Sequence, residues 1–501
     1  MKNNNIKNNT YNHLIAIIMI VTMFSCSNLT MDELSRDPNN PTEANLDLLI
    51  TNAQADIAGA FGYNWDRYAG TFVQTFAGNH AIGVNADRYQ LTSNDFTGFF
   101  NVPYRTGMKD AYEIIRVGTA SEQWQHVAMA KVMMATMLGA LTDVYGNIPY
   151  SEAFQGVLIS QPKYDTQESI YNAIFSLLEG AITDFNKTPS TPVNSSQDII
   201  YKGNINQWKA AANLLLARYH NHLSKKDPSG SATKALSYVD AAINLGMNNS
   251  GNFDFNYDGT SNWQNPWYVL YENNLIVASN KFMTLLKDTN DPRLRAYWDN
   301  KPFNYPLNGG VLGYIGKNNG DPTGGASYSP VGPSTYYGKK ASPQLIATYF
   351  ELRFIEAEAA MRANNPGRAA TALNAAINTQ LDLVTPTVVS LITAEGGDIP
   401  AYNAQIDAYK TLHANETAST VTMEKIMTEK YKAMFTMNLE TWTDMRRHNF
   451  SYPGNGYLSL PNNATLANYI RRGLYPQSEL DFNSSNVPSG ITMTDRLWWD
   501  E

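Results

Sequence analysis

Aromatic rings alternate with amide side chains in two segments, and this combination of residue types is suited to binding sugars. The segments are "DRYQLTSNDFTGFFNVPY", residues 87–104, and "SNWQNPWYVLYENN", residues 261–274. A sugar stacks its C–H face on a ring, while its hydroxyl groups require polar partners that cost free energy if left unpaired. The alternative is that many of these rings pack the loops onto helices. The residues expected to form one shared ligand surface are Tyr89, Phe99, Asn101, Trp263, Trp267 and Tyr268.

A calcium-loop pattern lies within "DFNYDGTSNWQN". Asp254, Asn256, Asp258 and Gly259 occupy its first, third, fifth and sixth positions. The twelfth position holds Asn265 instead of the glutamate that binds calcium through both oxygens. A tight turn built on the Asx and Gly residues is therefore favoured over a metal site. We expect no metal and no cofactor.

Candidate catalytic residues carry no recognisable motif. His220 and His222 are two apart on an expected helix, so their rings point to different faces. Asp95, Asp254 and Asp258 are acids of the kind that a glycoside hydrolase uses, but such an enzyme needs two carboxyl groups about 5–9.5 Å apart. The sequence contains no nucleophile elbow, P-loop or dinucleotide fingerprint. We expect a binding protein and not an enzyme, with a lipid-anchored glycoside hydrolase as the rival.

The single cysteine of the chain, Cys26, ends a bacterial export signal. Lys2 and Lys7 lie in a polar segment without acids, and an apolar run follows from Leu14 to Phe24. That run is shorter than the roughly 20 residues that a membrane span requires. The residues around Cys26 resemble a lipobox, where lipoproteins are cleaved and acylated. We expect a signal peptide over 1–25, a lipid-modified Cys26, and a tether over 26–45.

The composition is that of a globular protein without disulfides. The chain is 43% hydrophobic and carries a net charge of −8, which becomes about −10 when residues 1–25 and their two lysines are removed. An acidic balance does not favour nucleic acid as a partner. No segment after the signal is expected to span a membrane. Contact with the membrane is expected through the lipid at Cys26.

Helical periodicity dominates residues 46–501, and the helices come in adjacent pairs at about 124–186, 206–246 and 343–380. Successive helical hairpins that stack on one another are typical of tetratricopeptide-like repeats, with an irregular bundle as the alternative. The expected fold is therefore all-α, with tetratricopeptide-like helical hairpins and long loop-rich insertions.

Capping residues predict where several of these helices begin. Asp165 and Glu168 have the spacing of a capping box before the second helix of the first pair. In the third pair, Ser342-Pro343 and Asn365-Pro366 each have the pattern of an N-cap followed by proline at the first helical position. Segments without a clear period, expected to be long functional loops, cover residues 61–110, 246–342, 381–420 and 450–501.

The chain resembles the SusD/RagB family of nutrient-binding outer-membrane lipoproteins over nearly its whole length. The similarity rests on "NNPTEA", "LTDVYGNIPYSEAF", "PKYDTQESIY", "INQWKAAANLLLARYHNHL", "IMTEKYKAMFTMNLETWTDMRRHNF" and "YIRRGLYPQSELDFN". None of these is a catalytic motif. The resemblance implies an all-α fold with a loop-rich ligand-binding half, anchored by lipid at the outer membrane and exposed at the cell surface. It also implies delivery of a glycan, with peptide as the alternative cargo, to a SusC-like TonB-dependent transporter.

Overall fold

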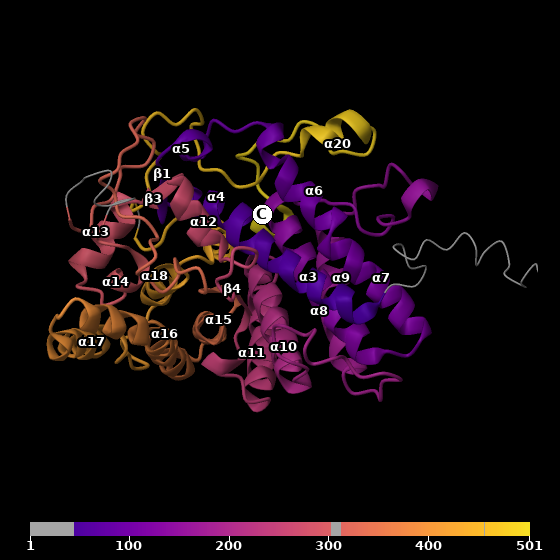
Figure 1. Ribbon diagram of the computed structural model, residues 1–501, viewed down its shortest axis with the longest axis horizontal. Helices are drawn as coiled ribbons and strands as arrows, with labels where there is room; N and C mark the ends of the chain where they lie inside the picture. The colour runs from indigo at the N-terminus through magenta and orange to yellow at the C-terminus, as the bar shows by residue number, and fades with distance from the viewer. Residues whose placement is uncertain (1–44, 302–311, 455) are drawn as a thin grey trace, which may run out of the picture. The chain divides into compact units, whose positions relative to one another are not determined.

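The computed structural model describes residues 45–301, 312–454 and 456–501, and the expected lipidation site at Cys26 lies outside them. Helices make up most of the described chain, so the expected all-α class is confirmed (Figure 1). The three expected pairs are α8 (Trp124–Tyr145) with α9 (Gln167–Asp184), α10 (Ile205–His222) with α11 (Pro228–Asn244), and α15 (Tyr349–Arg362) with α16 (Pro366–Ala394).

The loop between α8 and α9 is organised by Asp165, which is not the helix cap that its spacing predicts. The N-cap of α9 is Thr166, whose side chain accepts a hydrogen bond from the backbone N–H of Ser169. Asp165 instead accepts hydrogen bonds from the backbone N–H groups of Tyr150 and Ser151, at 2.9 and 2.7 Å. The expected capping box is therefore wrong, because the carboxylate is used to close the loop after α8.

The third pair begins with a strand and not with a helix. β4 (Pro343–Ala347) pairs antiparallel with β2 (Phe253–Asn256), and α15 starts only after Thr348, which forms a capping box with Glu351. The helix start expected at Pro343 is therefore wrong, since pairing with a distant strand overrides the local cap pattern. The start of α16 is confirmed: Asn365 caps it and Pro366 takes its first position.

Two segments that lack a clear period in the sequence, 61–110 and 381–420, are largely helical, contrary to expectation. α16 continues to Ala394 through Pro386, and α17 (Ile399–His413) follows. The proline and a run of β-branched residues obscure the helical period, whereas packing against α15 and α17 stabilises α16. The first segment contains a π-helix (Ala60–Trp65), α4 (Asp66–Phe72), α5 (Ala81–Asp87), a 3₁₀ helix (Ser93–Phe96), α6 (Thr97–Arg105) and the start of α7 (Gly107–Ala120).

The region between the second and third pairs is rich in loops, as expected. It holds β3 (Ile276–Ala278), which pairs antiparallel with β1 (Phe76–Gly78) to form a second two-stranded sheet. Short helices lie on both sides of β3 in the chain. They are α12 (Pro266–Asn273) before it, and α13 (Asn280–Asp288) and α14 (Leu294–Tyr297) after it. Further α-helices of the described residues are α3 (Leu46–Gly59), α18 (Met423–Ala433), α19 (Asn438–Arg447) and α20 (Gln477–Phe482).

Two helices, α8 and α16, are long and apolar enough to cross a membrane by length and composition, which corrects the expectation that none is. In α8, 94% of the apolar window is buried inside the protein. It packs against α7, α9 and α3, and its composition is that of a core helix. In α16 the buried share is 39%, and its buried face packs against α15.

Candidate functional site

Three of the six residues expected to contact a ligand are buried. Tyr89 and Trp267 are each 1% exposed and Phe99 is 4% exposed. Their rings pack against other core rings, with centroids 6.2 Å apart for Tyr89 and Phe72 and 5.1 Å apart for Trp267 and Phe76. A ring that packs the core on both sides offers no face to a ligand. These three residues therefore leave the candidate surface in this conformation.

The other three candidates are accessible, but they do not form one surface. Trp263 is 38% exposed and lines a hollow of about 370 Å³, whereas Asn101 lines a different hollow of about 280 Å³. Tyr268 is half-buried on α12, with Lys340 Nζ 4.9 Å from its ring centre. The Trp263 hollow is lined by Thr51, Ile199, Ile200, Lys202, Phe255, Asn256, Asp258 and Trp263. The Tyr104 hollow is lined by Phe100, Asn101, Tyr104, Arg105, Pro149, Ala153, Phe154, Pro162 and Glu479.

One wall of the Trp263 hollow is a pair of stacked rings. The ring of Trp263 lies 5.8 Å from that of Phe255 at an interplanar angle of 20°. Phe255 belongs to β2, and the chain then turns at Gly259, whose φ of 79° is readily adopted by glycine. The N–H of Gly259 donates to the carbonyl of Trp263, which closes the turn at 3.1 Å. The exposed indole is thus fixed on a buried ring before any ligand arrives.

The opposite wall is a loop built around one buried carboxylate. Asp198 accepts hydrogen bonds from Trp208 Nε1 at 2.8 Å and from Gln54 Nε2 at 2.9 Å. It also accepts from the backbone N–H groups of Tyr201 and Gly203, at 3.2 and 2.7 Å. These bonds hold the residues that precede α10 in one conformation. Among them, Lys202 adopts a φ of 53°, which is uncommon for a residue with a side chain.

Besides Thr51, three polar side chains line the Trp263 hollow. Lys202 is exposed, and its Nζ has no hydrogen-bond or ion-pair partner among the described residues. Asn256 is exposed and donates from Nδ2 to Asp254 at 3.3 Å, which leaves its Oδ1 without a partner in the described chain. Asp258 accepts from the backbone N–H and Oγ1 of Thr260, both at 2.8 Å. The hollow therefore presents a cation, an amide and a carboxylate beside an aromatic platform.

The calcium-loop pattern is resolved into separate structural roles. Asp258 Oδ1 closes an Asx turn with Thr260, as the favoured alternative predicts, and these hydrogen bonds lower the pKa of Asp258. Asp254 lies on β2, where burial raises its pKa to about 7 in spite of the hydrogen bond from Asn256. Asn265 caps α12 by accepting from the N–H of Trp267 at 2.7 Å. Two residues of the calcium-loop pattern, Asn256 and Asp258, line the Trp263 hollow.

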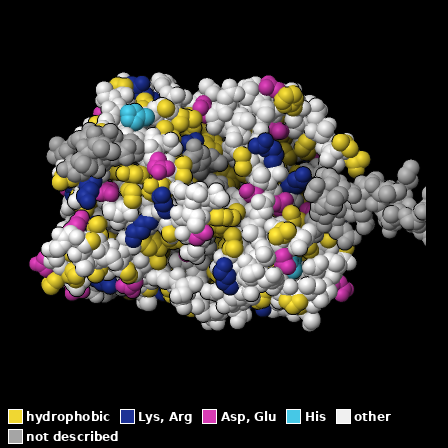
Figure 2. All heavy atoms as spheres, viewed as in Figure 1, with side chains coloured by type: hydrophobic (Ala, Val, Ile, Leu, Met, Phe, Trp, Pro, Cys, Tyr) yellow, Lys and Arg dark blue, Asp and Glu magenta, His cyan; other side chains and the backbone are white. Residues whose placement is uncertain are grey.

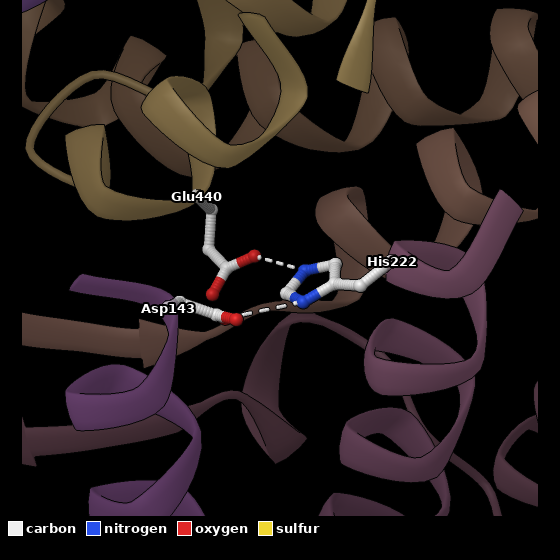
Figure 3. A group of neighbouring side chains, drawn as sticks. All are labelled: Asp143, His222 and Glu440. Atoms are coloured by element: carbon white, nitrogen blue, oxygen red, sulfur yellow. Dashed lines mark hydrogen bonds and ion pairs between the residues drawn. The ribbon is translucent and has the colours of Figure 1, made fainter. Parts of the chain in front are cut away.

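A buried cluster with metal-ligand residue types lies elsewhere, where α8, α10 and α19 meet. Its members are Asp143, His222 and Glu440, and their ligand atoms lie within 4.8 Å of one another. Figure 3 shows the imidazole between the two carboxylates. His222 Nδ1 is 3.2 Å from Asp143 Oδ2, and Nε2 is 2.9 Å from Glu440 Oε2. His220, two residues earlier, instead stacks on Phe175 with ring centres 4.0 Å apart, so the expected divergence of the two rings holds.

The contacts within this cluster are ion pairs between His222 and the two carboxylates. Burial lowers the pKa of His222, but Glu440 and Asp143 outweigh this effect and raise the pKa to about 9. An imidazolium that donates from both nitrogens has no lone pair for a metal. Tyr171 and Trp499 also donate to Asp143 Oδ1, at 2.6 and 3.0 Å. Asp143 Oδ1 thus has two protein donors, and each ring nitrogen of His222 faces a carboxylate oxygen.

Sequence reasoning located Trp263 but missed the residues that complete its hollow. Thr51 and Lys202 are far from Trp263 in the chain, and neither lies in an aromatic segment. One sequence feature indicates a special position for Lys202: Gly203 follows it directly in "DIIYKGN", a pattern typical of a turn. Thr51 carried none, since it is one polar residue on the helix α3. Only the folded chain brings these residues to Trp263.

The fold and the hollow define an all-α protein of stacked helical hairpins that carries an aromatic, polar-lined site on its loops. The chain matches the SusD-like family, described as "Starch-binding associating with outer membrane", over residues 38–476, and it belongs to that family. No curated protein matches the chain.

Solved structures of similar fold cover almost the whole chain. A SusD/RagB family protein from Bacteroides thetaiotaomicron has a TM-score of 0.77 and 24% identity, covering 91% of this chain and 99% of its own. A chitin-binding SusD homolog from Flavobacterium johnsoniae has a TM-score of 0.71 and 22% identity, with 90% and 98% covered. A SusD homolog from Bacteroides uniformis has a TM-score of 0.66 and 21% identity, with 90% and 99% covered. These similarities establish the fold.

Proposed function

We propose that this protein is a surface-exposed outer-membrane lipoprotein that binds a glycan in the Trp263 hollow and delivers it to a SusC-like TonB-dependent transporter. The observation that carries the proposal is the hollow itself, where a fixed indole lies beside Lys202 Nζ and Asn256 Oδ1, which have no partner among the described residues. Its volume of about 370 Å³ falls within the range of roughly 300–1,000 Å³ typical of ligand sites. Family membership supports the same reading.

The residue types in the hollow favour a neutral sugar. Lys202 and Asp258 carry opposite charges, so the walls have no net charge that would select an ionic ligand. The exposed face of Trp263 suits the C–H face of a sugar ring, and Asn256 offers a donor and an acceptor to its hydroxyls. On the face drawn in Figure 2, basic and acidic side chains are interspersed, and no continuous basic stripe of the kind that a phosphate backbone requires is seen there.

A panel of ligands tests this proposal. Purified protein is titrated with maltohexaose, chitohexaose, cellohexaose and a mixture of short peptides, with calorimetry as the readout. We expect saturable binding of at least one oligosaccharide and a weaker affinity for the Trp263→Ala variant. Binding of peptides alone would replace the glycan by a peptide as the cargo, and binding of neither would overturn the proposal.

The rival function is glycoside hydrolysis, and one observation gives it a specific candidate. Burial raises the pKa of Asp254 to about 7 while hydrogen bonds lower that of Asp258, which is the division expected of an acid and a base. Asp254 does not line the hollow, however, and Asp258 is held in its turn by Thr260. We expect no new reducing ends when the protein is incubated with the oligosaccharides. Their appearance, and their loss in Asp254→Asn, would establish an enzyme.

Anchoring through Cys26 is tested by fractionation in the native host. Acyl chains attached to Cys26 would add about 0.8 kcal/mol of membrane affinity for each buried methylene group. We expect Cys26→Ala to move from the outer-membrane fraction to the soluble fraction, and the unchanged protein to incorporate labelled palmitate. A variant that still sediments with the outer membrane, together with a wild type that takes up no label, would contradict the anchor.

The transporter is tested by purification from the outer membrane. A tethered binder that neither cleaves nor translocates its ligand must pass it to a pore, and a shared membrane raises the effective concentration of the two partners. We expect mild detergent and a tag on this protein to recover a large barrel protein in stoichiometric amount. Recovery of the lipoprotein alone, even after crosslinking, would leave a free-standing surface binder.

A further inference from the structure

The Tyr104 hollow contains a second aromatic platform, separate from the first. Ring centres lie 5.0 Å apart for Phe100 and Tyr104 and 6.0 Å apart for Tyr104 and Phe154, with interplanar angles of 34° and 30°. Tyr112 stacks behind Phe154 at 5.2 Å, and Tyr104 donates its hydroxyl to the carbonyl of Pro149 at 2.5 Å. Tyr104 and Phe154 are half-buried and line the hollow between α6 and the loop after α8, while Phe100 is buried and packs against Tyr104.

Polar groups lie at the edge of these rings, and part of their bonding capacity is free. Glu479 accepts from Tyr164 Oη at 2.9 Å and Asn483 Nδ2 at 3.1 Å, both on Oε2, so its Oε1 has no partner among the described residues. Arg105 is exposed, and its guanidinium has no hydrogen-bond or ion-pair partner in the described ranges. Asn101 donates to Ser478 Oγ at 2.9 Å, which leaves its carbonyl oxygen for another donor.

The backbone at Phe154 supports the same interpretation. Its φ of 66° is unusual for an aromatic residue, which prefers negative φ. Such conformations persist where the surroundings impose them, and they cluster at ligand sites. Lys202 shows the same feature in the Trp263 hollow. In both hollows, therefore, a left-handed residue contributes to the lining.

We propose that the Tyr104 hollow is a second sugar-binding site, specific for a neutral hexose or N-acetylhexosamine residue and independent of the Trp263 hollow. The rings of Tyr104 and Phe154 take the C–H face of the sugar. Arg105 donates to its oxygens, and the oxygens of Glu479 and Asn101 that have no partner among the described residues accept from its hydroxyl or amide groups. One cation and one carboxylate balance each other, so an acidic sugar gains no net attraction. This inference rests on glycan binding as the proposed function. Two sites would strengthen the binding of a polymer beyond that of a short oligosaccharide.

Two readouts separate the sites. The probes are maltohexaose and chitohexaose. Calorimetry counts all bound ligand. Tryptophan fluorescence reports on the Trp263 hollow, because no tryptophan lines the Tyr104 hollow. We expect calorimetry to give two sites on the wild type and one on Trp263→Ala, with the remaining binding silent in fluorescence. Arg105→Ala is expected to weaken the fluorescence-silent site about ten- to 150-fold, as for loss of a charged hydrogen bond.

Phe154→Ala is a second variant, expected to remove the platform, and its unfolding midpoint is measured because Phe154 also contacts Tyr112. The control is Arg116→Ala, an exposed arginine on α7 that pairs with Glu113 and lines neither hollow. One site on the wild type, lost in Trp263→Ala and unchanged in Arg105→Ala, would overturn the second site and leave the proposed function intact. No binding of either probe, or of any oligosaccharide on the wider panel, would overturn both.

Discussion

The Trp263 hollow and the Asp143–His222–Glu440 cluster contain similar residue types but use them in opposite ways. In the buried cluster, each ring nitrogen of His222 faces a carboxylate, and Asp143 also accepts from Tyr171 and Trp499. In the hollow, Lys202 Nζ and Asn256 Oδ1 have no partner among the described residues. A buried polar group without a partner costs free energy, while an exposed one is solvated until a ligand replaces the water.

The cluster and the hollow differ in how far their polar groups are already paired within the protein. The cluster combines a histidine with two acids, which are metal-ligand residue types, yet these groups pair with one another inside the fold. In the hollow, Lys202 Nζ and Asn256 Oδ1 remain without a hydrogen-bond partner among the described residues. Substitutions in the cluster should therefore change stability and leave binding intact, whereas substitutions in the hollow should do the reverse.

The largest effect is expected for Glu440→Ala. Removal of this carboxylate leaves the imidazolium of His222 buried with one partner fewer and takes from Arg218 an acid at 3.4 Å. Breaking a buried ion pair from one side costs about 3–5 kcal/mol in the free energy of unfolding, which urea denaturation measures. Glu113→Ala, in an exposed pair with Arg116, is the control and should cost less than about 1 kcal/mol. Equal stability of the two variants would refute the contrast.

A pH dependence of stability is expected from the same cluster. The pKa of His222 is raised to about 9 in the folded protein, so its contribution is complete below about pH 6.5 and is lost as the pH rises through 9. The free energy of unfolding should fall by up to about 3 kcal/mol over that interval. Urea denaturation at pH 6.5 and 9 measures the fall, and His222→Gln should reduce it. An identical fall in the variant would show that other groups cause it.

Trp263→Ala should weaken glycan binding with little change in stability. Loss of a recognition ring costs about 1–3 kcal/mol of binding free energy, which is about five- to 150-fold in affinity. The affinity is measured by calorimetry with the best oligosaccharide of the panel. Tyr268→Ala is the matched control, because this ring lies nearby on α12 but outside the hollow. A loss of affinity in the Tyr268 variant alone would move the site to α12.

The smallest effect is expected for Asn256→Ala. Its amide is placed to bond to a sugar hydroxyl, and a hydrogen bond between neutral groups contributes about 0.5–1.5 kcal/mol. Calorimetry should show a loss of about two- to tenfold in affinity, with the unfolding midpoint unchanged. The control is Asn262→Ala, an exposed amide outside the lining of the hollow. Similar losses in both variants would mean that the effect is not specific to the hollow.

The sequence predicted much of the fold, and the errors follow a pattern. The three helix pairs were visible because each helix keeps an apolar face with the period of 3.6 residues. The start of α15 was misplaced because β4 pairs with β2, about 90 residues earlier in the chain. The length of α16 was underestimated because Pro386 and its β-branched neighbours form a helix only through packing against α15 and α17.

The candidate site was predicted less well. Of the aromatic residues proposed as ligand contacts, Trp263 and Trp267 have the same chemistry and lie four positions apart. One is 38% exposed and the other 1%. Composition cannot separate them, because the distinction depends on Phe76, a distant residue that covers Trp267. Asn101 and Trp263, expected to share one ligand surface, line two hollows without a common lining residue.

The sequence alone predicts an export signal with Cys26 at its end. It also specifies the helical periodicity, the Asx turn at Asp258 and the aromatic residues among amides. These depend on residues close together in the chain. The burial of individual rings depends on the tertiary structure. So do the hydrogen bonds by which Asp198 fixes the loop bearing Lys202, and the ion pairs among Asp143, His222 and Glu440. Such outcomes depend on contacts between residues far apart in the chain, and a ring or a charge acquires its role only from what packs against it.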